Sequence, residues 1–207
     1  AMATCIWTAV GGRAATPDAP LVFCTTLALW LFARDCSSGP WGLTRRGAAA
    51  VGAACGIAAL AKGPVGIVLP AVAFLLFACW RRISRDAPTV GAALEGLHLP
   101  IVLGAAVGVA LPWYVCVGFL TEGAWLQGFL LVHNVGRFAA PMEGHSGSLL
   151  YYPAVVAVGL FPWSIVLAAM VAHAASIMRT GESAPNLRRR HGVALLACWT
   201  IAWIGVF

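Results

Sequence analysis

The sequence predicts an all-α, polytopic integral membrane protein, and its composition and apolar runs carry that prediction. Hydrophobic residues make up 61% of the 207 residues, and charged residues only 10%. Apolar runs of about 16 to 24 residues recur along the chain, which is the helix length that crosses a hydrocarbon core roughly 30 Å thick. The runs are apolar all round, whereas the helices of a soluble domain carry a polar face. A soluble fold is therefore disfavoured.

The apolar runs predict about six membrane-spanning helices. Their expected bounds are residues 17–34, 47–62, 64–80, 99–119, 149–172 and 192–207, with an outer loop at 120–148. Only Lys62, Gly63 and Pro64 separate the second run from the third, so the two form either a helical hairpin or one long kinked helix. Proline lacks an amide donor and restricts the residue before it, which favours a break here and hence the hairpin.

The arginines predict how these spans are oriented. With the hairpin, ten of them fall on one side of the membrane: Arg34, Arg45, Arg46, Arg81, Arg82, Arg85, Arg179, Arg188, Arg189 and Arg190. Arg13, Lys62 and Arg137 fall on the other side. Cytoplasmic loops carry an excess of Lys and Arg, so the arginine-rich side is expected to face the cytoplasm of a multi-pass protein in the inner (plasma) membrane.

The net charge of +6 comes from arginines in these loops, so it indicates membrane topology and does not indicate a nucleic-acid-binding protein. A nucleic-acid-binding protein would gather its arginines on a folded basic surface, whereas here they flank apolar runs. The sequence has no Walker loop and no GxGxxG in a strand–helix context, so no nucleotide or flavin cofactor is expected. We expect an internal fragment of a longer protein, because the chain begins without a signal-peptide pattern and stops at Phe207 within an apolar run.

Polar residues gather on the opposite, extracytoplasmic side, beginning with Lys62 and Asp18. Lys62 is the only lysine and lies at the Gly63–Pro64 break, where the next helix is expected to present free amides and partial positive charge to a phosphate. The alternative is a lysine that anchors the helix at the membrane interface. Asp18 begins the first span, either as a helix-capping acid or as a carboxylate at a polar cavity, paired with Arg13.

The segment 121–137 is too polar to span the membrane. It is expected to lie at the interface as an amphipathic helix, with Trp125, Phe129 and Val132 on one face. His133 and Arg137 follow at helical spacing and could address one anionic group, since guanidinium is the natural bidentate partner of phosphate. Alternatively, His133 could bind a metal ion together with a carboxylate from another loop.

The rest of the outer loop adds three weaker candidates. They are Asn134, Glu143 and His145. Glu143 and His145 lie in a Gly- and Ser-rich segment and could serve as acid–base groups or metal ligands. The pair Tyr151–Tyr152 that follows is typical of an aromatic belt at the membrane interface.

Three blocks of this sequence resemble the bacterial GT-C glycosyltransferases of the dolichyl-phosphate-mannose–protein mannosyltransferase superfamily. The blocks are GRAATPDAPLVFCTTLALWLFAR, AALAKGPVGIVLPAVAFLLF and GFLLVHNVGRFAAPMEGHSGSLLYYPAVVAVGLFPWSIVL, and with the spans between them they cover most of residues 12–172. The pattern is most similar to that of the 4-amino-4-deoxy-L-arabinose (lipid A) transferases. The resemblance implies a membrane enzyme that passes a sugar from a polyprenyl-phosphate donor to a lipid, glycan or protein acceptor on the extracytoplasmic side.

The resemblance also implies roles for individual residues. Lys62 and Arg137 would hold the donor phosphate, and His133 would be the ligand of a divalent metal ion. Asp18 matches an acidic residue near the family's cavity, whereas Glu143 and His145 match the family's loop pattern but receive no role from it. From the residues themselves, Asp18 and Glu143 are the carboxylates expected to be available for catalysis, and Arg13, Asn134 and His145 are further expected site residues. The family places its principal catalytic acid upstream of all three blocks, so this chain is expected to lack it.

Two readings from other classes stay open. A transporter or flippase of lipid-linked substrates would show charges within spans and inverted repeats, and the sequence shows neither. An inactive structural fragment of a membrane protein would not require polar residues to converge on one face.

Overall fold

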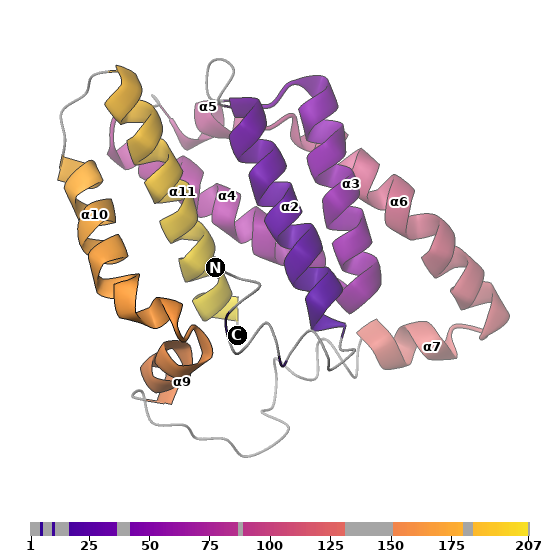
Figure 1. The fold of residues 1–207 in the computed structure, drawn as a ribbon. Helices are drawn as coiled ribbons and strands as arrows, with labels where there is room; N and C mark the ends of the chain where they lie inside the picture. The colour runs from indigo at the N-terminus through magenta and orange to yellow at the C-terminus, as the bar shows by residue number, and fades with distance from the viewer. Residues whose placement is uncertain are drawn as a thin grey trace.

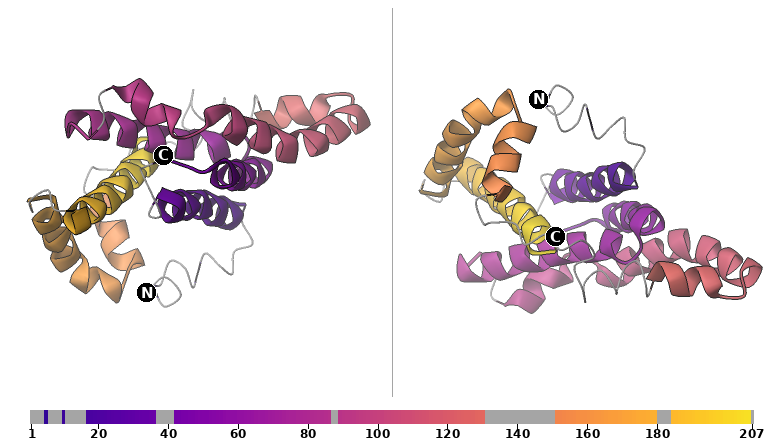
Figure 2. Two further views of the ribbon diagram at one scale, coloured as in Figure 1. Left: turned by 90° about the horizontal axis from the view of Figure 1, so that it is seen from above. Right: turned by 90° about the horizontal axis from the view of Figure 1, so that it is seen from below.

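The computed structural model describes residues 17–36, 42–86, 89–130, 151–179 and 184–206, together with Cys5 and Val10. Over these residues the chain is helical and contains no strand. The helices are α2 (Asp18–Cys36), α3 (Arg45–Lys62), α4 (Val65–Ile83), α5 (Val90–Glu95), α6 (Leu99–Leu120), α7 (Ala124–Leu126), α9 (Tyr151–Gly159), η3 (Trp163–Val166), α10 (Leu167–Arg179) and α11 (Ala184–Val206). In Figures 1 and 2, α2 and α3 lie side by side, and in Figure 1 α4 crosses behind them while α6 and α10 lie at opposite edges.

The core lies where α2, α3, α4 and α11 meet. Phe32 of α2 packs against Phe74 and Phe77 of α4, with ring centroids 4.7 and 6.0 Å apart. Leu195 and Cys198 of α11 belong to the same buried cluster. Figure 2 shows α2 and α3 foreshortened but α4 and α6 along much of their length, so the latter pair is inclined to the former.

Small residues on α3 let α6 approach closely. A Cβ atom added to Gly52 would lie 2.2 Å from the Val102 carbonyl oxygen, and one added to Gly56 would lie 2.6 Å from the Ala106 carbonyl oxygen. Close backbone contact through glycines is a common way for membrane helices to associate, because the hydrophobic effect does not drive their packing inside a bilayer. The α3–α6 contact therefore depends on the absence of side chains at these two positions.

The helix breaks between Lys62 and Val65, as the Gly63–Pro64 pair predicts. Gly63 has a positive φ of 69°, a conformation that favours glycine. Helix α4 then folds back, and its Phe74 and Phe77 share the core cluster with Val51 and Cys55 of α3. The structure thus has a helical hairpin here.

The expected number of about six spans is not confirmed. Among the described helices, three are long and apolar enough to cross a membrane, namely α2, α4 and α6. Helix α3 includes Arg45, Arg46 and Lys62, so its apolar stretch is shorter than its 18 residues. Helix α11 begins at Ala184, ahead of the expected start at residue 192, because the polar segment carrying Arg188–Arg190 joins the apolar one in a single helix.

The expected fifth span, 149–172, is not one continuous helix. Helix α9 ends at Gly159, a turn follows at 160–162, and the chain continues through the short 3₁₀ helix η3 into α10. Pro162 lacks the amide that would continue the α-helical hydrogen bonds across this point. The helix is thus interrupted at the proline that predicts a kink, and the crossing of a membrane by this segment stays a prediction.

The arginines of the described residues lie at the ends of helices that meet at one end of the bundle. Three polar contacts tie helix ends together there: Thr44 N donates to Asp35 Oδ2 (2.5 Å), Leu43 N donates to the Gly96 carbonyl oxygen (2.7 Å), and His191 Nε2 lies 3.1 Å from Asp86 Oδ2. These contacts join the end of α2, the start of α3, the α5–α6 corner, the end of α4 and the start of α11. We call this the arginine-rich end; the opposite end carries Lys62 and Asp18.

His191 ties α11 to α4 at the arginine-rich end. Its side chain is buried, and its imidazole and the Trp80 ring of α4 pack in a T-shaped arrangement with their centroids 5.4 Å apart. Phe77 contacts the same imidazole, at 6.1 Å. A polar residue two turns into α11 is thus packed against aromatic rings and held by a carboxylate.

Candidate functional site

The site at the other end of the bundle is built on an ion pair between Lys62 and Asp18. Asp18 lies in the first turn of α2 and Lys62 in the last turn of α3, and the Lys62 ammonium donates a hydrogen bond to Asp18 Oδ1. The Lys62 side chain is 23% exposed and that of Asp18 is 54% exposed, so solvent reaches the pair. The ends of two antiparallel helices thus present an ammonium and a carboxylate together.

Backbone hydrogen bonds at the Gly63–Pro64 corner correct one expectation about α4. The amides of Gly66, Ile67 and Val68 donate to the carbonyl oxygens of Gly63 and Pro64, at 3.0 to 3.1 Å. Val65 and Gly66 are buried against α3, where a Cβ added to Gly66 would lie 2.3 Å from the Ala58 carbonyl carbon. The start of α4 therefore does not offer these three amides to an anion, and the Lys62 ammonium is the cationic group of the corner.

Tyr114 holds the same corner from the α6 side. Its hydroxyl donates to the Ala59 carbonyl oxygen at 2.7 Å, and that oxygen also accepts from the Gly63 amide at 2.7 Å. Ala59 lies one turn before Lys62 on α3. Tyr114 thus connects α6 to the last turn of α3, which carries Lys62.

An aromatic cluster follows at the end of α6. Trp125 and Phe129 stack with centroids 4.5 Å apart, and Trp113 meets Trp125 edge-on at 4.9 Å. The expectation that Trp125 and Phe129 share one face is confirmed. The expected helix over 121–137 is present as the short α7 and a π-helical turn at 127–130, and residues 131–137 lie outside the described part of the chain.

Six of the predicted site residues lie outside the described residues. They are Arg13, His133, Asn134, Arg137, Glu143 and His145. Within the described ranges, no group of three or more His, Cys, Asp or Glu side chains comes together that could hold a metal ion. The roles proposed for these six residues, including metal binding by His133, stay predictions.

The Asp18–Lys62 pair was not predicted from the sequence. Sequence proximity pointed to Arg13 as the partner of Asp18, whereas Lys62 is 44 residues away. The signal that could have found the pair was the hairpin itself, because two successive spans place the start of the first and the end of the second on the same side of a membrane. Chemically, the pair offers a cation for a phosphate and a carboxylate that accepts hydrogen bonds or a proton.

Comparison with known proteins supports the family resemblance. Residues 1–103, which include both members of the pair, match the family model of dolichyl-phosphate-mannose-protein mannosyltransferases. A protein of Sodalis glossinidius (strain morsitans), named undecaprenyl phosphate-α-4-amino-4-deoxy-L-arabinose arabinosyl transferase 1, is 31% identical over 160 residues, or 76% of this chain and 25% of that protein. A transferase of the same kind from Yersinia pestis (strain Pestoides F) is 27% identical over 115 residues, or 56% of this chain and 19% of that protein.

These matches confirm the resemblance to the GT-C glycosyltransferases. The chain spans about a fifth to a quarter of the length of the curated relatives it matches. A comparison with solved structures found no match.

Proposed function

We propose that this chain is part of a membrane glycosyltransferase that transfers a sugar from a polyprenyl-phosphate donor to a lipid, glycan or protein acceptor. The observation that carries the proposal is the Lys62–Asp18 pair, which lies at a solvent-reached end of the bundle within the stretch that matches the family. The relatives are named for an undecaprenyl-phosphate-linked aminoarabinose, which is a sugar donor of this class.

In the proposed reaction, an acceptor hydroxyl attacks the anomeric carbon of the donor sugar. The bond between that carbon and the phosphate oxygen breaks, the polyprenyl phosphate leaves with the bonding electron pair, and a base takes the proton of the hydroxyl. Negative charge grows on the leaving phosphate, so a fixed cation beside it lowers the barrier. Lys62 is proposed as that cation, joined by Arg137 of the outer loop.

Asp18 is proposed to hold the Lys62 ammonium at the edge of this site. The carboxylate also partly neutralises the ammonium before a donor binds, which limits the cost of keeping a cation beside the hydrocarbon layer. His133, Asn134, Glu143, His145 and Arg13 are proposed to complete the site from the segments around it, with His133 as the ligand of any divalent metal ion.

The site is proposed to face the extracytoplasmic side. The support is the arginine-rich end, where the ends of α2 and α4 and the starts of α3 and α11 lie. Arginine-rich ends of spans are retained in the cytoplasm, so the opposite end is expected outside. The Lys62 end lies at the opposite ends of α2 and α3. A lipid-linked donor would present its phosphate at that interface while its chain remains in the membrane.

The test is transfer of labelled 4-amino-4-deoxy-L-arabinose from its undecaprenyl-phosphate donor to a lipid acceptor by membranes that contain the protein in its full reading frame. Lys62→Ala is expected to lower kcat/KM about tenfold to a hundredfold, because a hydrogen bond to a charged group contributes about 1.5–3 kcal/mol. Lys62→Arg is expected to retain most of the transfer, since guanidinium also binds phosphate.

Arg46→Ala is the matched control, because Arg46 is an exposed cation on the same helix at the arginine-rich end. It is expected to leave transfer unchanged. Full transfer by Lys62→Ala, at a membrane level equal to that of the unsubstituted protein, would rule out Lys62 as a donor ligand.

A further inference from the structure

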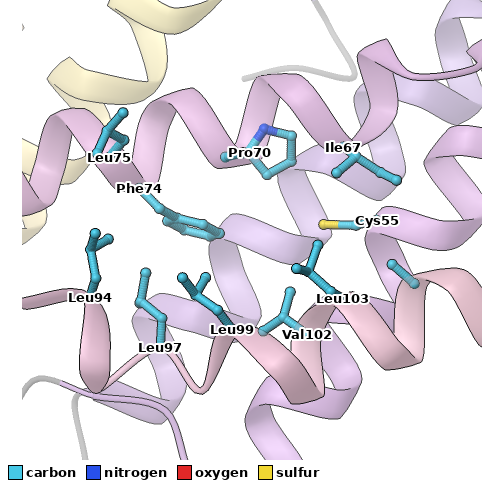
Figure 3. Close-up of a pocket in the computed structure, with 12 residues that line it drawn as sticks. Cys55, Ile67, Pro70, Phe74, Leu75, Leu94, Leu97, Leu99, Val102 and Leu103 are labelled. Atoms are coloured by element: carbon cyan, nitrogen blue, oxygen red, sulfur yellow. The ribbon is translucent and has the colours of Figure 1, made fainter. Parts of the chain in front are cut away.

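An apolar groove lies between α4 and α6, away from the Lys62–Asp18 site. Its volume is about 220 Å³, and Figure 3 shows Phe74 of α4 facing Leu99 and Leu103 of α6 across it. Leu94 and Leu97, from α5 and the turn after it, close the end of the groove that lies toward the arginine-rich end. The lining carries hydrocarbon side chains and the Cys55 thiol.

The groove opens to the surface between two helices that are long and apolar enough to cross a membrane. Leu75, Leu99 and Leu103 line it and are each about half exposed, at 48%, 43% and 52%. Around it, α6 presents a continuous apolar surface, of which Val107 and Leu111 are further exposed members. In a membrane that α4 and α6 cross, the opening would face the hydrocarbon layer.

The chemistry of the lining selects an occupant without polar atoms. An extended or irregular peptide segment that entered the groove would leave backbone amides and carbonyls without partners, which is costly where no water reaches. A saturated hydrocarbon chain carries no such groups, and it fills an apolar groove through dispersion contacts.

The charges at the end of the groove select the headgroup. Arg82 follows Leu75 by seven residues, two turns further along the same face of α4, and its side chain is exposed. Arg85 is also exposed, in the turn after α4, and Glu95 at the end of α5 is an exposed carboxylate nearby in the chain. Each cation near the membrane surface contributes about 1 kcal/mol to the attraction of anionic lipid headgroups.

We propose that the α4–α6 groove binds one acyl chain of an anionic phospholipid, whose headgroup lies beside Arg82. The lipid comes from the leaflet at the arginine-rich end, opposite to the end that carries Lys62. It is thus a separate ligand from the sugar donor, and the inference stands whether or not the transferase proposal holds.

The experiment measures lipid binding by native mass spectrometry. The protein, purified in its full reading frame, is titrated in detergent with phosphatidylglycerol or phosphatidylcholine, and the lipid that stays bound after release from the detergent is measured. Ala71→Trp places a large ring in the groove from an exposed position on α4. We expect it to lower the affinity for phosphatidylglycerol about tenfold, because the ring takes up volume that the acyl chain would fill. Val107→Trp, one turn beyond Leu103 and outside the lining, is the control and is expected to bind as the unsubstituted protein does.

Arg82→Ala tests the headgroup. It is expected to lower the affinity for phosphatidylglycerol about fivefold while leaving phosphatidylcholine unchanged. Unaltered binding by Ala71→Trp, with melting temperature and elution volume also unaltered, would overturn the proposal. So would undecaprenyl phosphate that displaces phosphatidylglycerol from the unsubstituted protein but does not bind Ala71→Trp, because the groove would then hold the donor lipid.

Discussion

Asp18 and Lys62 meet at the ends of two neighbouring helices, and the exposure of the pair decides what it contributes. Asp18 is 54% exposed, and ion pairs that water reaches contribute about 0–1 kcal/mol to stability. The pair therefore contributes little to the stability of the fold. Its main effect is on position, since it holds an ammonium beside Gly63 at a boundary where a lysine side chain would otherwise extend into water.

Substitution of Asp18 separates positioning from chemistry. Asp18→Asn keeps a hydrogen-bond acceptor but removes the charge, so we expect the KM for the lipid donor to rise about threefold, with kcat nearly unchanged, because an exposed pair is worth less than about 1 kcal/mol. Asp18→Glu is expected to restore KM. Steady-state transfer at varied donor concentration measures both, and a hundredfold fall in kcat at constant KM would instead mean that Asp18 acts on the reacting atoms.

At the scale of helices, the apolar runs predicted which segments are helical, and proline and glycine decided where helices end. The break at Gly63–Pro64 was predicted because the two residues are adjacent and interrupt a clear pattern. The break at 160–162 falls at Pro162, which has the same effect and predicts a kink, although the apolar run continues on both sides of it. Helix α5 has six residues and no periodic signal long enough to reveal it.

The packing between α3 and α6 could not be predicted from either helix alone. Gly52 and Gly56 are visible in the sequence, but which partner helix they face depends on the hairpin and on the α5 corner that returns the chain to α3. The Asp18–Lys62 pair escaped prediction for the same reason, because it follows from the tertiary arrangement of two helices and from no local pattern.

Gly56 provides the test at this scale. A valine there would place its Cβ 2.6 Å from the Ala106 carbonyl oxygen, so α3 and α6 must separate. We expect Gly56→Val to destabilise the protein by about 1–3 kcal/mol, the usual cost of overpacking, seen as a lower melting temperature in detergent. Gly108→Ala on α6 is the control, because a Cβ there meets nothing within 4 Å, and alanine favours the helix. Equal loss in both variants would contradict close packing at Gly56.

For the whole molecule, the sorting of charges by helix ends links the fold to the membrane. The contacts of Asp35 with Thr44, Leu43 with Gly96 and Asp86 with His191 bring the arginine-bearing ends together, as the hairpin predicts. Lys62 and Asp18 lie at the other ends of the same helices. This arrangement requires α3 to extend from the arginine-rich end to the Lys62–Asp18 end, although the charged residues at its two ends shorten its apolar stretch.

Reporter fusions test that arrangement and the orientation together. Alkaline phosphatase is active only outside the cytoplasm, so a fusion after Glu122 is expected to be active and fusions after Arg46 and Arg85 inactive, because arginine-rich loops are retained inside. A fusion after Gly63 is expected to be active if α3 crosses the membrane. Green fluorescent protein at the same four positions should give the reverse pattern. Activity after Arg85 together with none after Glu122 would invert the topology and place the Lys62 site in the cytoplasm. Inactive phosphatase after Gly63 alone would mean that α3 does not cross, so that α4 begins on the arginine-rich side and the two charge groups share one face.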